Sequence, residues 1–223
     1  MTQLILACVS FVGSHLLLSH HLRVPLVKTL GDARFLWFYS FVGAATFGWI
    51  VYAFRQMPAQ APLWVAGEAV WTLSSFIMLL AAMLFVGSLV RNPAMTTTSA
   101  NLLTQIPIGV FKITRHAMNA SFVLWAIAHV LVSPRPAVIV LAGAIATLAV
   151  VGSIGQDRKK LRLHGEPWRQ WMEQTAFIPF SKGAAFPGMH AVGGGLVIWL
   201  LATWLHPHLG AGQSVGLWRW LGW

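Results

Sequence analysis

Six stretches of this chain are apolar and contain no Lys, Arg, Asp or Glu. They span residues 1–19, 35–54, 69–90, 117–133, 137–155 and 189–206. A helix that crosses a membrane needs about 20 predominantly apolar residues, with a range of roughly 17–25. Because a helix satisfies its own backbone hydrogen bonds, such stretches cross hydrocarbon as helices. We therefore predict an all-α fold, a polytopic transmembrane helix bundle with about six spans.

The chain has too few charged residues to cover a soluble domain. They make up 9% of its 223 residues, whereas a soluble domain carries about a quarter. We therefore expect a single integral membrane domain over residues 1–223. Residues 156–188 are its only sizeable polar segment, and we predict that they fold within this domain as an amphipathic cap on the cytoplasmic side. Residues 99–113 are half apolar and are expected to lie along the membrane surface.

The net charge of +10 is explained by basic residues gathered on one side of the membrane, and it does not indicate a nucleic-acid partner. With six spans, alternate loops lie on opposite sides of the membrane. One side then holds only Arg55, Arg135 and Arg219, and the other holds the remaining 12 of the 15 basic residues. Since basic loops stay in the cytoplasm, both termini are predicted to be periplasmic in a bacterial cytoplasmic (inner) membrane. Membrane lipid is the expected partner, and nucleic acid is not.

Two histidines, His15 and His129, lie inside apolar stretches. An imidazole in hydrocarbon usually faces a partner, a cavity or a metal, and histidine is the commonest metal ligand. Both are therefore candidate metal ligands, and the carbonyl of Trp125, one turn back, is expected to orient His129. Counted along the helices, His129 lies deeper than His15, so a pair of His15 with His116, or one histidine alone, stays open. An interhelical hydrogen bond is the alternative for each ring.

Eight short motifs, in order along nearly the whole chain, resemble the NnrU family of membrane proteins. They are Gly13-Ser14-His15, Gly31-Asp32-Ala33-Arg34, Arg91-Asn92-Pro93, Ile113-Thr114-Arg115-His116, Ala128-His129, Gly155-Gln156-Asp157-Arg158-Lys159, Gly165-Glu166-Pro167-Trp168 and Phe177-Ile178-Pro179-Phe180. The family takes its name from bacterial loci for nitric oxide and nitrite reduction. It includes the plant and cyanobacterial 15-cis-ζ-carotene isomerase, a haem b protein with membrane-embedded histidine ligands.

The resemblance implies a haem b site. The ligand positions of the isomerase are similar to His15 and His129, and His116 matches a neighbouring histidine. A haem also needs cations beside its propionates, and Arg34, Arg115 or Arg91, near the cytoplasmic interface, are the candidates. The implied function is either a link to nitrogen-oxide metabolism (denitrification), with a membrane oxidoreductase as partner, or haem-dependent cis–trans isomerisation of a carotenoid, with a hydrophobic polyene as substrate. Whether the protein is an enzyme stays open.

The second half is also similar to the isoprenylcysteine carboxyl methyltransferases. That group binds S-adenosylmethionine through an Arg-His-Pro-x-Tyr motif and an acidic pair. Here Arg115-His116 is followed by Ala117 and Asn119 where the group has proline and tyrosine, and Asp157 is a lone acid. We interpret the likeness as shared architecture. A membrane methyltransferase and a cofactor-free assembly factor for a membrane oxidoreductase are the alternatives to a haem protein.

Overall fold

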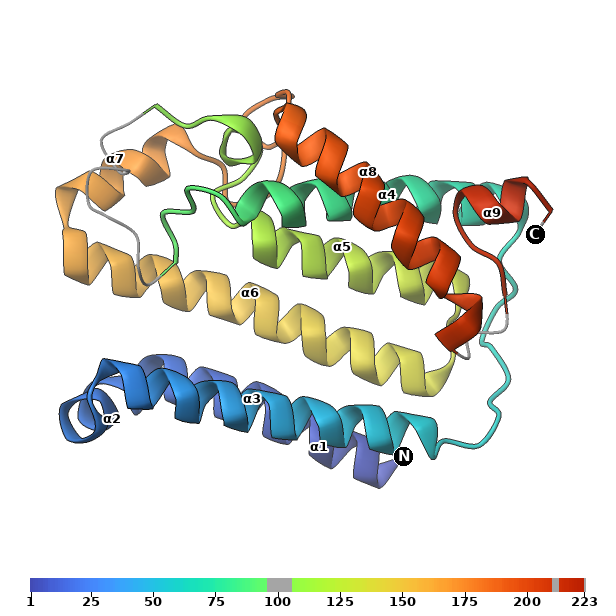
Figure 1. Ribbon diagram of the computed structural model, residues 1–223, viewed down its shortest axis with the longest axis horizontal. Helices are drawn as coiled ribbons and strands as arrows, with labels where there is room; N and C mark the ends of the chain where they lie inside the picture. Colours follow the sequence, from blue (N-terminus) through green and yellow to red (C-terminus); the bar gives the residue numbers. More distant parts are fainter. Residues whose placement is uncertain (96–105, 210–212, 223) are drawn as a thin grey trace.

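The computed structural model describes residues 1–95, 106–209 and 213–222, and this part of the chain contains helices and no strands (Figure 1). The helices are, in order, α1 (Thr2–Leu16), the π-helix η1 (Leu17–His21), α2 (Arg23–Leu30), α3 (Asp32–Arg55), α4 (Glu68–Ser88), the 3₁₀-helix η3 (Gly109–Lys112), α5 (Ala117–Val132), α6 (Pro136–His164), α7 (Glu166–Gln174), α8 (Met189–Leu205), the 3₁₀-helix η4 (Pro207–Leu209) and α9 (Leu217–Trp220). The predicted all-α class is confirmed.

Four helical stretches are long and apolar enough to cross a membrane. They are Thr2–His21, which joins α1 to η1, and the helices α3, α4 and α6. The other two apolar helices, α5 and α8, have 16 and 17 residues. At about 1.5 Å per residue they measure roughly 24–26 Å, which is shorter than the hydrocarbon core of about 30 Å. Four helices are thus candidate membrane spans, as expected of a multi-pass membrane protein, while six full spans and the side of the termini stay predictions.

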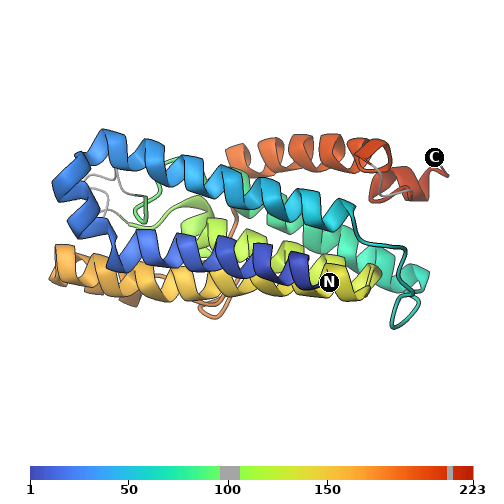
Figure 2. The ribbon, with the colours of Figure 1, turned by 90° about the horizontal axis from the view of Figure 1, so that it is seen from below.

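The long helices run side by side in a curved row. Helix α1 packs between α3 and α6, α5 packs between α6 and α4, and α8 crosses the far side of α4 (Figures 1 and 2). Glycines allow the last crossing, because a Cβ on Gly195 would lie 2.7 Å from the backbone of Met83 and one on Gly194 would lie 2.7 Å from Val86. Small residues of this kind let helix backbones approach closely within a membrane.

The two ends of the bundle differ. At one end, which we call the cap end, α2 and α7 lie near the start of α5 and the end of α6 (Figure 1). At the opposite end, which we call the terminal end, the N-terminus lies near the link between α5 and α6 and the end of α8 (Figure 1). Helix α6 has 29 residues, about 43 Å, and exceeds the hydrocarbon core. Its apolar stretch, residues 137–155, is long enough to cross the membrane, and its charged last turns extend past that stretch at the cap end.

A buried cluster closes the cap end. Helix α7 begins after Gly165 and turns Trp168 and Trp171 inward against Leu84, Val110 and Ile113. The expectation that residues 99–113 lie along the membrane surface is wrong for its last part, since Val110, Phe111 and Ile113 are at most 3% exposed. Their apolar side chains fill the space under α7, which removes more apolar surface from water than a membrane-surface position would. Residues 99–105 lie outside the described residues.

Candidate functional site

His15 lies near the end of α1 and packs on α3. Its Nδ1–H donates to the carbonyl oxygen of Phe11, 2.9 Å away, so its Nε2 carries the lone pair that could bind a metal. Gly43 makes room for the ring, because a Cβ there would lie 3.3 Å from its Cε1 and Nε2. The ring of Tyr39 approaches to 5.4 Å between centroids. This histidine is therefore oriented, but by residues of α1 and α3 alone.

His129 has the same local arrangement on α5. Its Nδ1–H donates to the carbonyl oxygen of Trp125 at 2.8 Å, as the sequence predicted, which leaves Nε2 as the unprotonated nitrogen. The indole of Trp125 lies 4.1 Å from the imidazole between ring centroids. The ring of His206, at the end of α8, lies 6.3 Å from that of His129. His129 therefore faces a second imidazole that the sequence reasoning had assigned no role.

The structure does not bring His15 and His129 together. His15 lies 13 residues after the start of α1, about 20 Å along the helix, and His129 lies three residues before the end of α5, about 5 Å. Both of these helix ends lie at the terminal end (Figure 1), so the two rings differ by roughly 15 Å along the bundle. Two nitrogens that share one metal lie about 4 Å apart. The pair implied by the resemblance does not meet that condition in this arrangement.

His116 and Arg115 belong to a buried ionic network at the cap end. Asp157 accepts hydrogen bonds from Nε and Nη2 of Arg115, at 2.9 and 2.8 Å, and lies 2.9 Å from Nε2 of His116. A third bond runs from Nη1 of Arg115 to the carbonyl of Thr175 at 3.1 Å. The side chains of the three charged partners are at most 10% exposed. The network ties the start of α5 to α6 and to the chain after α7.

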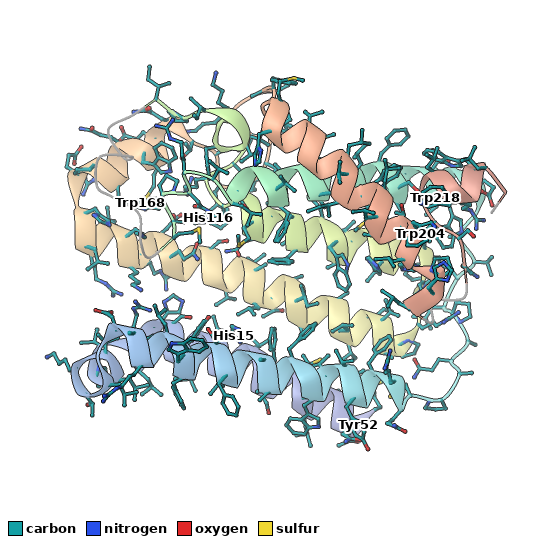
Figure 3. The ribbon with its side chains drawn as sticks, viewed as in Figure 1. His15, Tyr52, His116, Trp168, Trp204 and Trp218 are labelled. Atoms are coloured by element: carbon teal, nitrogen blue, oxygen red, sulfur yellow. The ribbon has the colours of Figure 1, made fainter. Side chains whose placement is uncertain are left out.

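Three other residues were predicted to contact the haem: His116, Arg115 and Arg34. In Figure 3, His116 and His15 lie on opposite sides of α6. Because Arg115 is already paired with Asp157, it is not available to a haem propionate. Arg34 is exposed in the first turn of α3, at the cap end, and so lies far from His129. The structure therefore gathers neither arginine around the His129 ring.

The same network weighs against the methyltransferase alternative. Asp157 is the acid available to the similar motif, and it is engaged by Arg115 and His116. Asn119, which stands where the methyltransferases have tyrosine, donates to Ser153 at 2.8 Å. Both positions therefore hold helices together, and neither presents a free carboxylate to a cationic cofactor.

The donor set at the terminal end fits a haem better than a bare metal ion. Among the described residues, no group of three or more His, Cys, Asp and Glu side chains could hold an ion. A haem iron receives four nitrogens from its own ring and needs only one or two side chains from the protein. The buried Nδ1 of His206 has no hydrogen-bond partner in the described part of the chain, which leaves it open to a ligand. A pair formed by His129 and His206 thus satisfies the requirement.

A protein-family model matches most of the chain. The family model described as NnrU protein matches residues 3–213. The chain belongs to the NnrU family. The motifs that carry the resemblance in the sequence fall within this match. A search of curated proteins and a search of solved structures each found no match. For this NnrU protein the ligands, the substrate and the chemistry are therefore argued from its own residues.

Proposed function

We propose that this NnrU protein binds haem b within the bacterial cytoplasmic membrane, through His129 and His206. The observation that carries the proposal is the distance of 6.3 Å between the two ring centroids. Two imidazoles on opposite faces of one iron have centres roughly 6.3 Å apart, given metal–nitrogen bonds of about 2 Å and about 1.1 Å from nitrogen to ring centre. His129 and His206 come from helices at the same end of the bundle.

The neighbouring residues prepare His129 for this role. The hydrogen bond from Nδ1–H to the Trp125 carbonyl fixes the tautomer and the orientation of the ring. The Trp125 indole packs against the imidazole and restricts its rotation. The position of His206 is determined by α8, the helix that it directly follows. That helix is held against α4 by the close contact of Gly195 with Met83. When bound, haem would supply a redox-active iron.

The surroundings favour a small polar ligand over a polyene. A shallow, open surface depression of about 530 Å³ at the terminal end is lined by Glu68, Gln213, Ser214, Arg219 and Gly222. The backbone of Gln213 also lies close to the His206 ring. A polyene requires mostly apolar walls, whereas four of these five residues have polar side chains. We therefore assign the protein to nitrogen-oxide metabolism, with electron transfer to or binding of a nitrogen oxide, in preference to carotenoid isomerisation.

The test is the visible spectrum of detergent-purified protein, oxidised and reduced. Wild-type protein is expected to carry a six-coordinate haem. The His129→Ala variant should lose the haem or become five-coordinate, and His206→Ala should become five-coordinate and regain the six-coordinate spectrum when imidazole is added. His208→Ala is the matched control, because His208 is two residues from His206, exposed, and packed on Trp204. It should leave the spectrum unchanged.

Two results would contradict the proposal. One is a wild-type protein that stays colourless after incubation with haem. The other is a coloured protein whose spectrum changes in His15→Ala but not in His206→Ala. The second result would return the assignment to the ligand position that the resemblance implies.

A further inference from the structure

A cluster of cations lies at the cap end, away from the proposed haem ligands. Arg23 of α2 lies close enough to Lys159 and Lys160 of α6 to repel their positive charges. Arg162 repels Lys159 and the protonated form of His20 in the same way. We propose that Arg23, Lys159 and Arg162 form a binding site for the phosphate of an anionic phospholipid, between α2 and the projecting end of α6. This site is independent of haem binding.

The cluster is brought together by a close helix contact. A Cβ on Gly155 would lie 2.4 Å from Cε1 and Nε2 of His20, so the His20 ring rests directly on the backbone of α6. This contact requires a glycine. His20 lies in the π-helix η1, an element that is frequent at functional sites. Arg23, the first residue of α2, follows this contact by three residues. Its guanidinium lies 5.0 Å from the centroid of the Phe35 ring of α3, close enough to Lys159 and Lys160 of α6 to repel them.

No described ion pair neutralises these cations. The chain has five acidic residues, and the structure describes all of them. Asp157 pairs with Arg115 and His116, Glu68 with Arg219, and Glu166 with Arg169. Neither Asp32 nor Glu173 forms an ion pair in the described part of the chain. Like charges held together without a counterion repel one another, so an external anion that binds here is favoured.

Lys160 and Lys159 differ in their roles. Lys160 is 6% exposed, and its Nζ donates to the carbonyl of Met95 at 3.1 Å, so it is a fixed charge behind the site. Lys159 is half-buried and lies beyond the membrane-crossing stretch of α6. Burial, together with Arg23, Lys160 and Arg162, lowers the pKa of Lys159 to about 8. A bound anion would stabilise the charged form of this amine, so binding and protonation of Lys159 are linked.

Exposed apolar residues on the helical turns that carry the cations favour a lipid over free phosphate. Leu22 and Val24 flank Arg23, and Leu161 and Leu163 flank Arg162. All four have exposed side chains, at 36–65% of their surface. Exposed aliphatic side chains on the same helical turns as the cations suit the boundary between headgroups and acyl chains. Free phosphate gains nothing from the aliphatic part, whereas a phospholipid contacts both.

The proposal is tested by native mass spectrometry of delipidated protein titrated with short-chain phosphatidylglycerol. The Arg23→Gln/Lys159→Gln variant should bind it roughly 25-fold more weakly, at about fivefold for each removed cation near a membrane surface. Arg162→Gln alone, an exposed position, should lose about fivefold. Arg158→Gln is the matched control, because Arg158 adjoins Lys159 on α6 but is exposed outside the cluster. It should bind as the wild type does, and every variant should keep the haem spectrum of the wild type.

Two further measurements separate the sources of the phosphate. Inorganic phosphate and short-chain phosphatidylcholine should not displace phosphatidylglycerol, and its binding should weaken as the pH rises from 7 to about 9, across the pKa of Lys159. Equal displacement by inorganic phosphate would overturn the lipid assignment. A loss in Arg158→Gln as large as in the double variant would overturn the site, because it would show general surface attraction.

Discussion

At the scale of single residues, Asp157 has the largest structural role. Its carboxylate is paired with Arg115 and His116, and none of the three side chains is more than 10% exposed. Removing one member of a buried ionic network leaves the others charged and unpaired, which costs far more than losing an exposed pair. Asp157 therefore stabilises the folded protein, although the sequence placed it in a candidate cofactor motif.

Asp157→Asn is expected to lower the free energy of unfolding by about 3–5 kcal/mol, since it leaves the Arg115 guanidinium buried without a counter-charge. The control is Glu166→Gln, because Glu166 and its partner Arg169 have side chains that are 62% exposed, and its loss should cost less than about 1 kcal/mol. Both are measured by unfolding in mixed detergent micelles. Equal effects of the two substitutions would contradict a buried network.

At the scale of elements, the contact between α4 and α8 decides whether the two proposed ligands meet. His206 directly follows α8, and Gly195 holds that helix against the backbone of Met83. A backbone neighbour cannot rotate away as a side chain can. Any side chain at Gly195 must therefore separate the two helices and move His206 away from His129.

Gly195→Ala should destabilise the protein by about 1–3 kcal/mol, as overpacking of a tight contact does, and should shift the haem spectrum toward five-coordinate. Gly193→Ala is the matched control on the same helix, because a Cβ there meets nothing within 4 Å. Alanine favours a helix by about 1 kcal/mol over glycine, so this control should be neutral or stabilising. If Gly195→Ala kept both the wild-type stability and the spectrum, the close approach of α8 would not determine the ligand pair.

At the scale of the whole molecule, the charged residues are distributed by membrane side. The long helix α6 carries Arg158, Lys159, Lys160 and Arg162 beyond its apolar stretch, and the cap folds at the same end. The positive-inside rule predicts that this end is cytoplasmic. On that prediction, the proposed haem pair at the terminal end would lie near the periplasmic surface, and a nitrogen oxide from the periplasm would reach it without crossing the bilayer.

Reporter fusions test this orientation. Alkaline phosphatase, active only after export, should be active when fused after Trp223, and green fluorescent protein should fluoresce when inserted at Gly165, the exposed turn between α6 and α7. Reversed activities would show the opposite orientation. They would also place the cation cluster on the periplasmic side, while leaving the histidine geometry unchanged.

The sequence was sufficient for the all-α class with membrane-length apolar helices, for the family and for the Trp125 bond of His129. Each of these depends on residues close together in the chain, such as an apolar run, a short motif or a carbonyl one helical turn away. The lengths of α5 and α8 were less certain, because apolar residues continue past a helix end that capping and loop packing determine.

Only the tertiary structure showed which side chains meet. It separated His15 from His129, placed His206 opposite His129, bound Arg115 and His116 to Asp157, and set Arg23 beside Lys159. These outcomes depend on how each helix is rotated and how closely it approaches its neighbours. Those quantities follow from glycine contacts and buried ion pairs between distant parts of the chain, which composition and periodicity do not record.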